Sequence, residues 1–336
     1  MELVVMHDSK SCVARRGSST LPSGTKKMKS KILVILGQTA TGKTGLGVKL
    51  AKKWKGEVIS ADSRQVYKGL DLGTHKITKQ EMRGVPHHLL DVASPKKNFS
   101  VVQFKKLAEK KITEILKRKK LPIIVGGTGF YIQAIVDNVD FPEHKPDLKL
   151  RAKLEKKNTE QLFKILKKLD PKRAKNIDQK NPRRLMRAIE IAKALGHVPR
   201  LDTPRPSQYD ALQIGLTPHP EILKTKIKYR FIKDLDNIIN EVKKLRNPPA
   251  GGGLSWKRLK ELGLYYREVA LYLEGKIKKE EMIQKIFSVL WQYAKRQKTW
   301  FQRDPRIHWF DPSKKSDLIK LNKQVLVFLK QRNHRG

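Results

Sequence analysis

One segment of eight residues constrains this chain more than any other, because it fits the phosphate-loop pattern G-x-x-x-x-G-K-[ST]: Gly37, Gln38, Thr39, Ala40, Thr41, Gly42, Lys43 and Thr44. The apolar run from Ile32 to Leu36 precedes it and is typical of a strand buried on both faces of a parallel sheet. Between such a strand and a helix, the backbone amides of the loop converge on phosphate oxygens. Lys43 would neutralise the distal phosphate, and the Thr44 hydroxyl would ligate Mg²⁺. The segment therefore predicts a diphosphate-binding loop.

Strand and helix signals alternate after this loop. Val58 to Ala61 indicates a second strand, and Ile123 to Val125 indicates a third. Between them, Ser100 and Gln103 form a capping-box pattern that opens an amphipathic helix through about Lys119. The alternation predicts an α/β fold, with a P-loop NTPase-like, doubly wound parallel sheet and flanking helices.

The composition of the chain changes after Phe141. Lysine-rich helical segments follow, in which Asp170-Pro171 and Asn181-Pro182 each place a capping residue before a proline at the first helical position. We expect a helical insertion domain at residues 140–206, after which Ala211 to Leu216 rejoins the sheet and helices dominate to the end. Residues 31–139 with 207–336 would form the catalytic core, and residues 1–30 a disordered or mis-started extension.

The charge balance points to a polyanionic partner. Lys and Arg number 74 against 32 Asp and Glu, which gives a formal net charge of +42 and an isoelectric point near 10.3. Nucleic acid is the leading candidate, because Lys and Arg contacts to phosphates release counterions and dominate affinity. The alternative is that the lysines only keep the surface solvated. Net charge carries information about possible partners and not about the fold.

The sequence also predicts a cellular compartment. No apolar run approaches the ~20 residues that span a bilayer, so we expect no membrane association. The N-terminal stretch lacks the apolar segment of a secretory signal, and the single cysteine, Cys12, excludes an internal disulfide and a multi-cysteine zinc site. We expect a cytoplasmic protein.

Two further strand ends carry candidate chemistry. Asp62 follows the second strand, so its carboxylate should emerge at the sheet edge that bears the phosphate loop, either to hold magnesium or to act as a general base. The third strand ends in Gly126-Gly127-Thr128 rather than in a carboxylate. These small residues would let a substrate approach the backbone, although two glycines are equally consistent with an ordinary turn.

Six motifs occur in order along the chain: the phosphate loop at 37–44; Asp62-Ser63 with Tyr67 and Gly73-Thr74; Pro86 to Asp91; Gly126-Gly127-Thr128; Pro182 to Arg187; and Lys295-Arg296-Gln297 with Thr299-Trp300. Together they resemble the tRNA dimethylallyltransferase (tRNA isopentenyltransferase) family over about residues 31–312. One departure is Leu264-Tyr265-Tyr266, where the family usually shows Ile-Gly-Tyr. Tyr265 in place of that glycine removes backbone freedom. We expect this difference to affect local contacts with tRNA and not the chemistry.

The resemblance implies an activity and the residues that perform it. A monomer would transfer a dimethylallyl group from dimethylallyl diphosphate to the N6 amine of the adenosine 3′-adjacent to the anticodon, without consuming ATP. Asp62 resembles the general base, and Thr128 and Arg230 resemble the residues that hold the diphosphate and its bridging oxygen. Lys43 and Thr44 would complete the leaving-group site, Thr44 through Mg²⁺. Arg230 is singled out only by this resemblance, since its helix is otherwise an ordinary basic one.

The tRNA anticodon stem-loop is the expected partner, because a target base must leave its loop to reach such a pocket. The expected tRNA contacts form three groups: Asp62, Ser63, Arg64 and Gln65 beside the adenosine; Arg183, Arg184, Leu185, Met186 and Arg187 on the insertion; and Lys295, Arg296, Gln297, Lys298, Thr299, Trp300, Phe301 and Gln302 near the C-terminus. Basic and aromatic residues together suit phosphate contact and base stacking. The alternative is that Trp300 and Phe301 belong to the core.

Other interpretations remain open at this point. His87 and His88 invite a metal hypothesis, but adjacent residues of an extended segment point to opposite faces, which favours structural or channel-lining roles. The phosphate loop alone also fits a small-molecule or nucleoside kinase, which would bind ATP and transfer phosphoryl groups. A non-catalytic RNA-binding protein that kept the fold is the remaining alternative.

Overall fold

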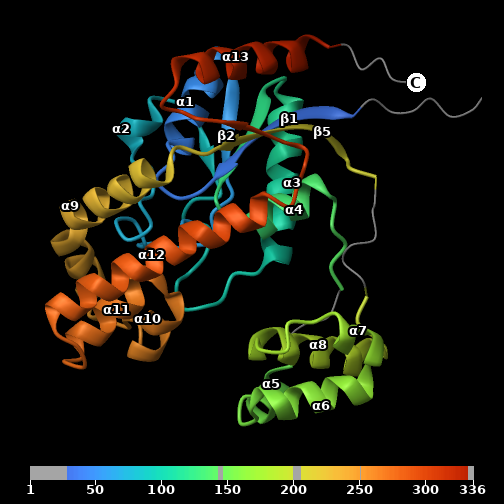
Figure 1. Ribbon diagram of the computed structural model, residues 1–336, viewed down its shortest axis with the longest axis vertical. Coiled ribbons are helices and arrows are strands. Elements are labelled where there is room, and N and C mark those ends of the chain that lie inside the picture. Colours follow the sequence, from blue (N-terminus) through green and yellow to red (C-terminus); the bar gives the residue numbers. More distant parts are fainter. Residues whose placement is uncertain (1–28, 143–146, 200–205, 250, 332–336) are drawn as a thin grey trace, which may run out of the picture.

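A computed structural model describes residues 29–142, 147–199, 206–249 and 251–331. The predicted extension at 1–30 lies outside these ranges, apart from its last two residues. The six strands within them form one parallel sheet in the order β3-β2-β4-β1-β5-β6 (Figure 1): β1 (Ser30–Gly37), β2 (Gly56–Ser60), β3 (His87–His88), β4 (Leu121–Gly126), β5 (Tyr209–Leu216) and β6 (Ile307–Phe310). The predicted parallel α/β fold is confirmed.

Helices follow or cover the strands: α1 (Lys43–Lys53), α2 (Lys79–Met82), α3 (Val101–Lys117), α4 (Gly129–Val136), α9 (Pro220–Arg246), α10 (Trp256–Leu262), α11 (Leu264–Leu273), α12 (Lys279–Phe301) and α13 (Lys315–Lys330). The predicted capping box of Ser100 and Gln103 is present at the start of α3, which ends two residues before the predicted Lys119. The sequence analysis missed β3 and β6, two short strands at the edges of the sheet.

Alternate residues of β1 face two different cores. Val34 and Leu36 pack with α3, α9 and α12 on one face, whereas Leu33 and Ile35 pack with α1 and α13 on the other. Both faces of the strand are therefore buried, which explains its continuous apolar sequence. Figure 1 shows α13 at the top of the molecule, on the same side as α1.

A third core lies in the lysine-rich segment. Leu162, Leu166 and Leu185 are fully buried in a cluster that belongs to α5 (Leu148–Leu154), α6 (Thr159–Leu169), α7 (Pro171–Lys175) and α8 (Pro182–Leu195). Figure 1 shows these helices as a separate group at the lower right. Asp170 and Asn181 cap α7 and α8 and are followed by proline, as predicted. The boundaries of a domain at 140–206 stay a prediction.

Candidate active site

The carboxyl ends of β1, β2 and β4 meet at one edge of the sheet, where a cavity of about 540 Å³ opens. Parallel strands bring their carboxyl ends to the same edge, so segments far apart in sequence converge there. The cavity lining comes from the phosphate loop, the end of β2, the glycine turn after β4, the loop before α2, and helices α9 and α12. It includes Lys43, Thr44, Asp62 and Arg230, four of the residues predicted to act on the diphosphate or the adenosine.

The phosphate loop is fixed to α12 by side-chain hydrogen bonds. Gln38 Nε2 donates to the Ala294 carbonyl at 3.1 Å, and the Thr39 amide donates to Gln297 Oε1 at 2.8 Å. Gly42 has φ 88°, a conformation that favours glycine, and it directly precedes Lys43 at the start of α1. The loop therefore joins a buried strand to a helix N-terminus, the arrangement that phosphate binding requires.

Lys43 lies in the cavity wall, and its ammonium group donates to the Gln38 carbonyl. Burial lowers the pKa of Lys43 to about 8, a shift that Arg230 increases and that the nearby carboxylate of Asp62 opposes. A bound diphosphate would favour the charged form of this lysine in the same way as Asp62 does.

Asp62 is held by the turn that follows it. Its Oδ1 accepts hydrogen bonds from the amides of Arg64 at 2.8 Å and Gln65 at 3.3 Å. Its Oδ2 accepts none from the described residues, so one carboxylate oxygen is open to the cavity that Asp62 lines. The Ser63 amide donates to Thr128 Oγ1 at 2.9 Å, which ties the end of β2 to the turn after β4.

Tyr293 was missed by the sequence analysis. It lines the cavity from α12 and has a pKa raised by burial and by the charge of Asp62. Tyr293 and Gln297 are four residues apart on α12 and face the same site, a spacing that could have identified the pair.

The glycines after β4 are required by packing within the protein. A Cβ added at Gly126 would lie 2.1 Å from the Ala61 carbonyl oxygen, and one at Gly127 would lie 2.2 Å from Gln297 Nε2. At Gly129 it would lie 2.1 Å from the Trp300 ring. These close contacts give a reason for the small residues that does not depend on the predicted approach of a substrate.

Arg230 lines the cavity from α9, in a group with His75, Asp234 and Tyr265. Burial lowers the pKa of Arg230, an effect that Tyr265 and Asp234 oppose. Tyr265 is buried, and its hydroxyl lies 3.0 Å from His75 Nε2. At the start of the Leu264-Tyr265-Tyr266 segment, the residues with positive φ are Gly263 (70°) and Leu264 (48°). Tyr265 itself therefore does not need the backbone freedom of glycine.

Comparisons with known proteins identify the family of the chain. The model of the IPP transferase family matches residues 65–304. The tRNA dimethylallyltransferase of Carboxydothermus hydrogenoformans is 41% identical over 309 residues, which cover 89% of this chain and 97% of that protein. The chain belongs to the tRNA dimethylallyltransferase family.

Two solved structures extend the comparison. The tRNA isopentenylpyrophosphate transferase of Bacillus halodurans is 37% identical, with a TM-score of 0.66, and the match covers 90% of this chain and 97% of that one. A eukaryotic dimethylallyltransferase, whose structures follow its action on tRNA, is 27% identical, with a TM-score of 0.73 and coverage of 89% and 78%. The fold and the family predicted from the sequence are thereby confirmed.

The residues predicted to contact tRNA fall into an exposed, a buried and a half-buried set. Exposed are Arg183, Arg184, Lys295, Arg296, Thr299 and Gln302. Buried are Leu185, Gln297 and Phe301, and half-buried are Asp62, Ser63, Arg64, Gln65, Met186, Arg187, Lys298 and Trp300. Leu185 belongs to the core of α5–α8 and Phe301 to the main core, as the alternative for Phe301 predicted.

The two histidines have structural partners. His88 Nε2 lies 2.7 Å from the buried carboxylate of Glu57, which also pairs with Arg118 and Lys120. His87 Nδ1 lies 2.8 Å from the Val85 carbonyl oxygen. No group of three metal-ligating side chains occurs within the described ranges. None of the helices there combines the length and the apolarity that crossing a bilayer requires.

The histidine in the cavity wall predicts an acid-sensitive stability for this family member. The imidazole of His75 lies 3.5 Å from Asp234, but burial and the charge of Arg230 lower its pKa to about 3. In the unfolded chain it takes up a proton below pH about 6.5. Because the unfolded state then binds the extra proton, this contribution to stability is complete above pH about 6.5 and is lost as the pH falls toward about 3.

Chemical denaturation at pH 7, 6 and 5 would measure this loss. We expect His75→Asn to reduce the dependence of the unfolding free energy on pH, by an amount that approaches about 1.4 kcal/mol per pH unit as the pH falls below about 6.5. His308→Asn, at an exposed position, is the control and should leave the dependence as in the wild type. An unchanged slope in the His75 variant would contradict the assignment.

Proposed function

We propose that this chain transfers the dimethylallyl group of dimethylallyl diphosphate to the N6 amine of the adenosine 3′-adjacent to the anticodon of tRNAs. The observation that carries the proposal is the convergence of Lys43 and Arg230 with Asp62 in one cavity. The cations suit a diphosphate, and the carboxylate suits an acceptor amine. The relatives named above are called tRNA dimethylallyltransferase and tRNA isopentenylpyrophosphate transferase, names that support transfer of a prenyl group to tRNA.

In the proposed reaction, the bond between C1 of the dimethylallyl group and the diphosphate oxygen breaks, and a bond from N6 to C1 forms. The leaving diphosphate keeps the electron pair of the broken bond and develops negative charge. Lys43, Arg230 and the amides of the phosphate loop stabilise that charge more in the transition state than in the ground state. The Thr128 hydroxyl is proposed to contact the bridging oxygen.

Asp62 is proposed to accept the proton that N6 loses. Its Oδ1 is fixed by two backbone amides, so Oδ2 is the oxygen that would take the proton. General base catalysis of this kind contributes about 10² to 10⁴-fold to a rate.

Mg²⁺ is a proposed cofactor. Thr44 is exposed in the first turn of α1 and offers one hydroxyl oxygen to the cavity. A hard cation held by one hydroxyl, diphosphate oxygens and waters fits the preference of Mg²⁺ for few protein ligands. When bound, it would supply positive charge to the diphosphate.

A mass-resolved transfer assay would test the function. Purified protein, Mg²⁺, unmodified tRNA and dimethylallyl diphosphate are incubated beside a reaction that contains ATP. We expect a five-carbon mass gain on the adenosine beside the anticodon that is independent of ATP. Consumption of ATP without prenyl transfer would instead establish the kinase alternative. Binding of tRNA with neither reaction would establish the non-catalytic one.

The insertion is proposed to grip the anticodon arm through α8. Arg183 is exposed at its start, and Arg187 lies one turn later, 3.5 Å from Glu190. We expect Arg183→Ala with Arg187→Ala to weaken tRNA binding and to reduce the slope of log K against log salt by about 1 to 2. We also propose that the protein acts in the cytoplasm as a monomer.

Binding titrations at several salt concentrations would measure that slope. Lys315→Ala with Lys320→Ala removes the same charge from exposed positions on α13 and is the matched control. If both pairs of substitutions changed the slope equally, the effect would belong to net charge and not to α8.

A further inference from the structure

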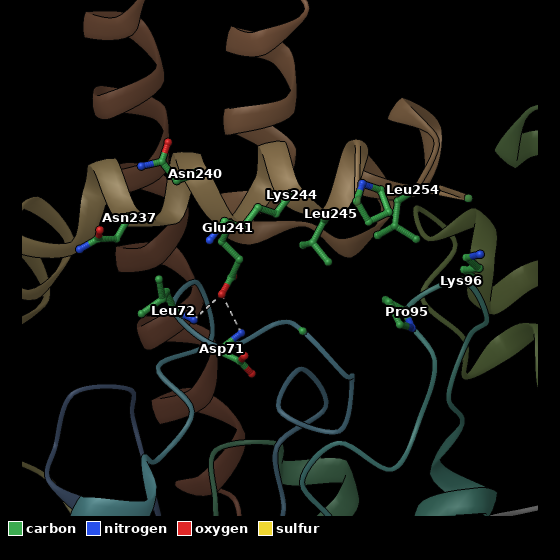
Figure 2. Close-up of a pocket in the computed structure, with 14 residues that line it drawn as sticks. Asp71, Leu72, Pro95, Lys96, Asn237, Asn240, Glu241, Lys244, Leu245 and Leu254 are labelled. Atoms are coloured by element: carbon green, nitrogen blue, oxygen red, sulfur yellow. Dashed lines mark hydrogen bonds between the residues drawn. The ribbon is translucent and has the colours of Figure 1, made fainter. Parts of the chain in front are cut away.

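Glu241 is a buried carboxylate for which the proposed chemistry has no use. It lies on α9, is 9% exposed, and accepts four hydrogen bonds. Oε2 accepts from the amides of Asp71 at 2.9 Å and Leu72 at 2.7 Å (Figure 2). Oε1 accepts from the Gly73 amide at 3.2 Å and from the Tyr266 hydroxyl at 2.7 Å. Three consecutive amides of one loop thus converge on a single side chain.

The charge of Glu241 is satisfied by these donors. Three of these donors are backbone amides and the fourth is a tyrosine hydroxyl, so none of the four is a lysine or an arginine side chain. A buried charge needs hydrogen-bond partners, so the loop and the carboxylate hold each other in place. The fit is close, because a Cβ added at Gly73 would lie 2.7 Å from the Tyr266 hydroxyl oxygen. Figure 2 shows the Glu241 side chain leaving α9 toward Asp71 and Leu72.

The loop that Glu241 holds leads directly into the cavity. Its next residues, Thr74 and His75, line the cavity, and their carbonyls each accept a hydrogen bond from Gln65 Nε2 at 3.3 Å. The amide of Gln65 in turn donates to Asp62 Oδ1. Hydrogen bonds, linked through the backbone of residues 73–75 and through Gln65, therefore connect Glu241 to the proposed general base.

The same helix carries Arg230, a cation in the wall of the cavity. Arg230, Asp234 and Glu241 are spaced by four and seven residues, so they share one face of α9. Arg230 lines the cavity, and Asp234 lies 3.5 Å from the His75 ring. Helix α9 thus fixes the position of the 71–75 loop relative to Arg230.

We propose that Glu241 is a positioning residue for the prenyl transfer: its carboxylate holds residues 71–75 against α9 and so places the target adenosine between Asp62 and Arg230. Glu241 acts through the loop and Gln65. This role rests on the proposed function.

Glu241→Gln tests the proposal, because it keeps the size of the side chain but replaces one acceptor oxygen with a donor. We expect the single-turnover transfer rate, at saturating tRNA and dimethylallyl diphosphate, to fall about 10 to 100-fold, since small displacements of reacting groups have effects of this size. The dissociation constants for inorganic pyrophosphate and for tRNA should stay within about threefold of the wild type, because the loop contributes little ground-state binding. Tyr266→Phe, which removes one donor, should give a smaller loss in the same direction.

Glu57→Gln is the matched control. Glu57 is 2% exposed and has side-chain partners in His88, Arg118 and Lys120, none of which belongs to the 71–75 loop. The Glu57→Gln variant should have a lower unfolding temperature, and the transfer rate of the folded protein should be unchanged. If folded Glu241→Gln transfers the prenyl group at the wild-type rate, the positioning role is overturned. It is also overturned if the loss of transfer equals the fraction of the variant that is unfolded. No transfer by the wild-type chain overturns the proposed function and, with it, this role.

Discussion

Asp62→Asn lowers the single-turnover rate of prenyl transfer by about 10²-fold or more, which corresponds to about 2.7 kcal/mol of activation free energy. Asparagine keeps the side-chain oxygen that accepts from the amides of Arg64 and Gln65, so the turn after β2 should keep its shape. The variant loses only the oxygen that is proposed to take the N6 proton. The affinity for tRNA should stay within about threefold of the wild type.

Rapid-quench transfer assays and tRNA binding titrations would separate the two effects. Asp236→Asn is the control, since this exposed carboxylate contacts Lys279 and does not line the cavity. Unchanged transfer by Asp62→Asn would remove Asp62 from the mechanism. A loss that appeared only as weaker tRNA binding would make it a binding residue.

Lys43→Ala lowers kcat/KM for dimethylallyl diphosphate by about 10² to 10³-fold, the range found when one group that stabilises developing negative charge is removed. The ammonium group lies in the cavity wall beside the phosphate loop. Lys49→Ala, on an exposed position of the same helix α1, removes an equal charge and should have little effect. A similar loss in both variants would show that general charge, and not the site, binds the diphosphate.

The pKa of Lys43 adds a pH dependence to this prediction. Because burial lowers that pKa to about 8, the free protein carries the charge below pH 8 and loses it above. We expect kcat/KM for the diphosphate to fall as the pH rises through about 8, since this ratio reports the ionisation of the free enzyme. The affinity of the wild type for pyrophosphate, measured between pH 6.5 and about 9.5, should fall over the same pH range. Lys43→Ala should not show this fall.

The sequence predicts those parts of the molecule whose cause is local. The phosphate loop needs particular residues at particular positions, and the caps at Ser100, Asp170 and Asn181 follow from side chains that bond to amides three residues away. The continuous apolar pattern of β1 follows from burial on both faces. These features are confirmed because each depends on neighbours along the chain.

The features that were missed depend on partners far away in sequence. Strands β3 and β6 are short, and only their pairing with β2 and β5 makes them strands. The contacts of Glu241 with residues 71–73 span about 170 positions, and nothing near either segment indicates them. Tyr265 was interpreted from the glycine that it replaces, but its contact with His75 across 190 positions decides its place.

The side chain of Gln297 joins two strand ends, since it accepts from the Thr39 amide and donates to the Gly127 carbonyl at 2.9 Å. The contact with Thr39 spans 258 positions of the chain. During synthesis on the ribosome, the phosphate loop therefore emerges long before the residue that fixes it. A nascent chain that ends before α12 would carry the phosphate-loop motif without its supporting helix, and the site becomes complete only after Gln297, 258 positions beyond Thr39, has been translated.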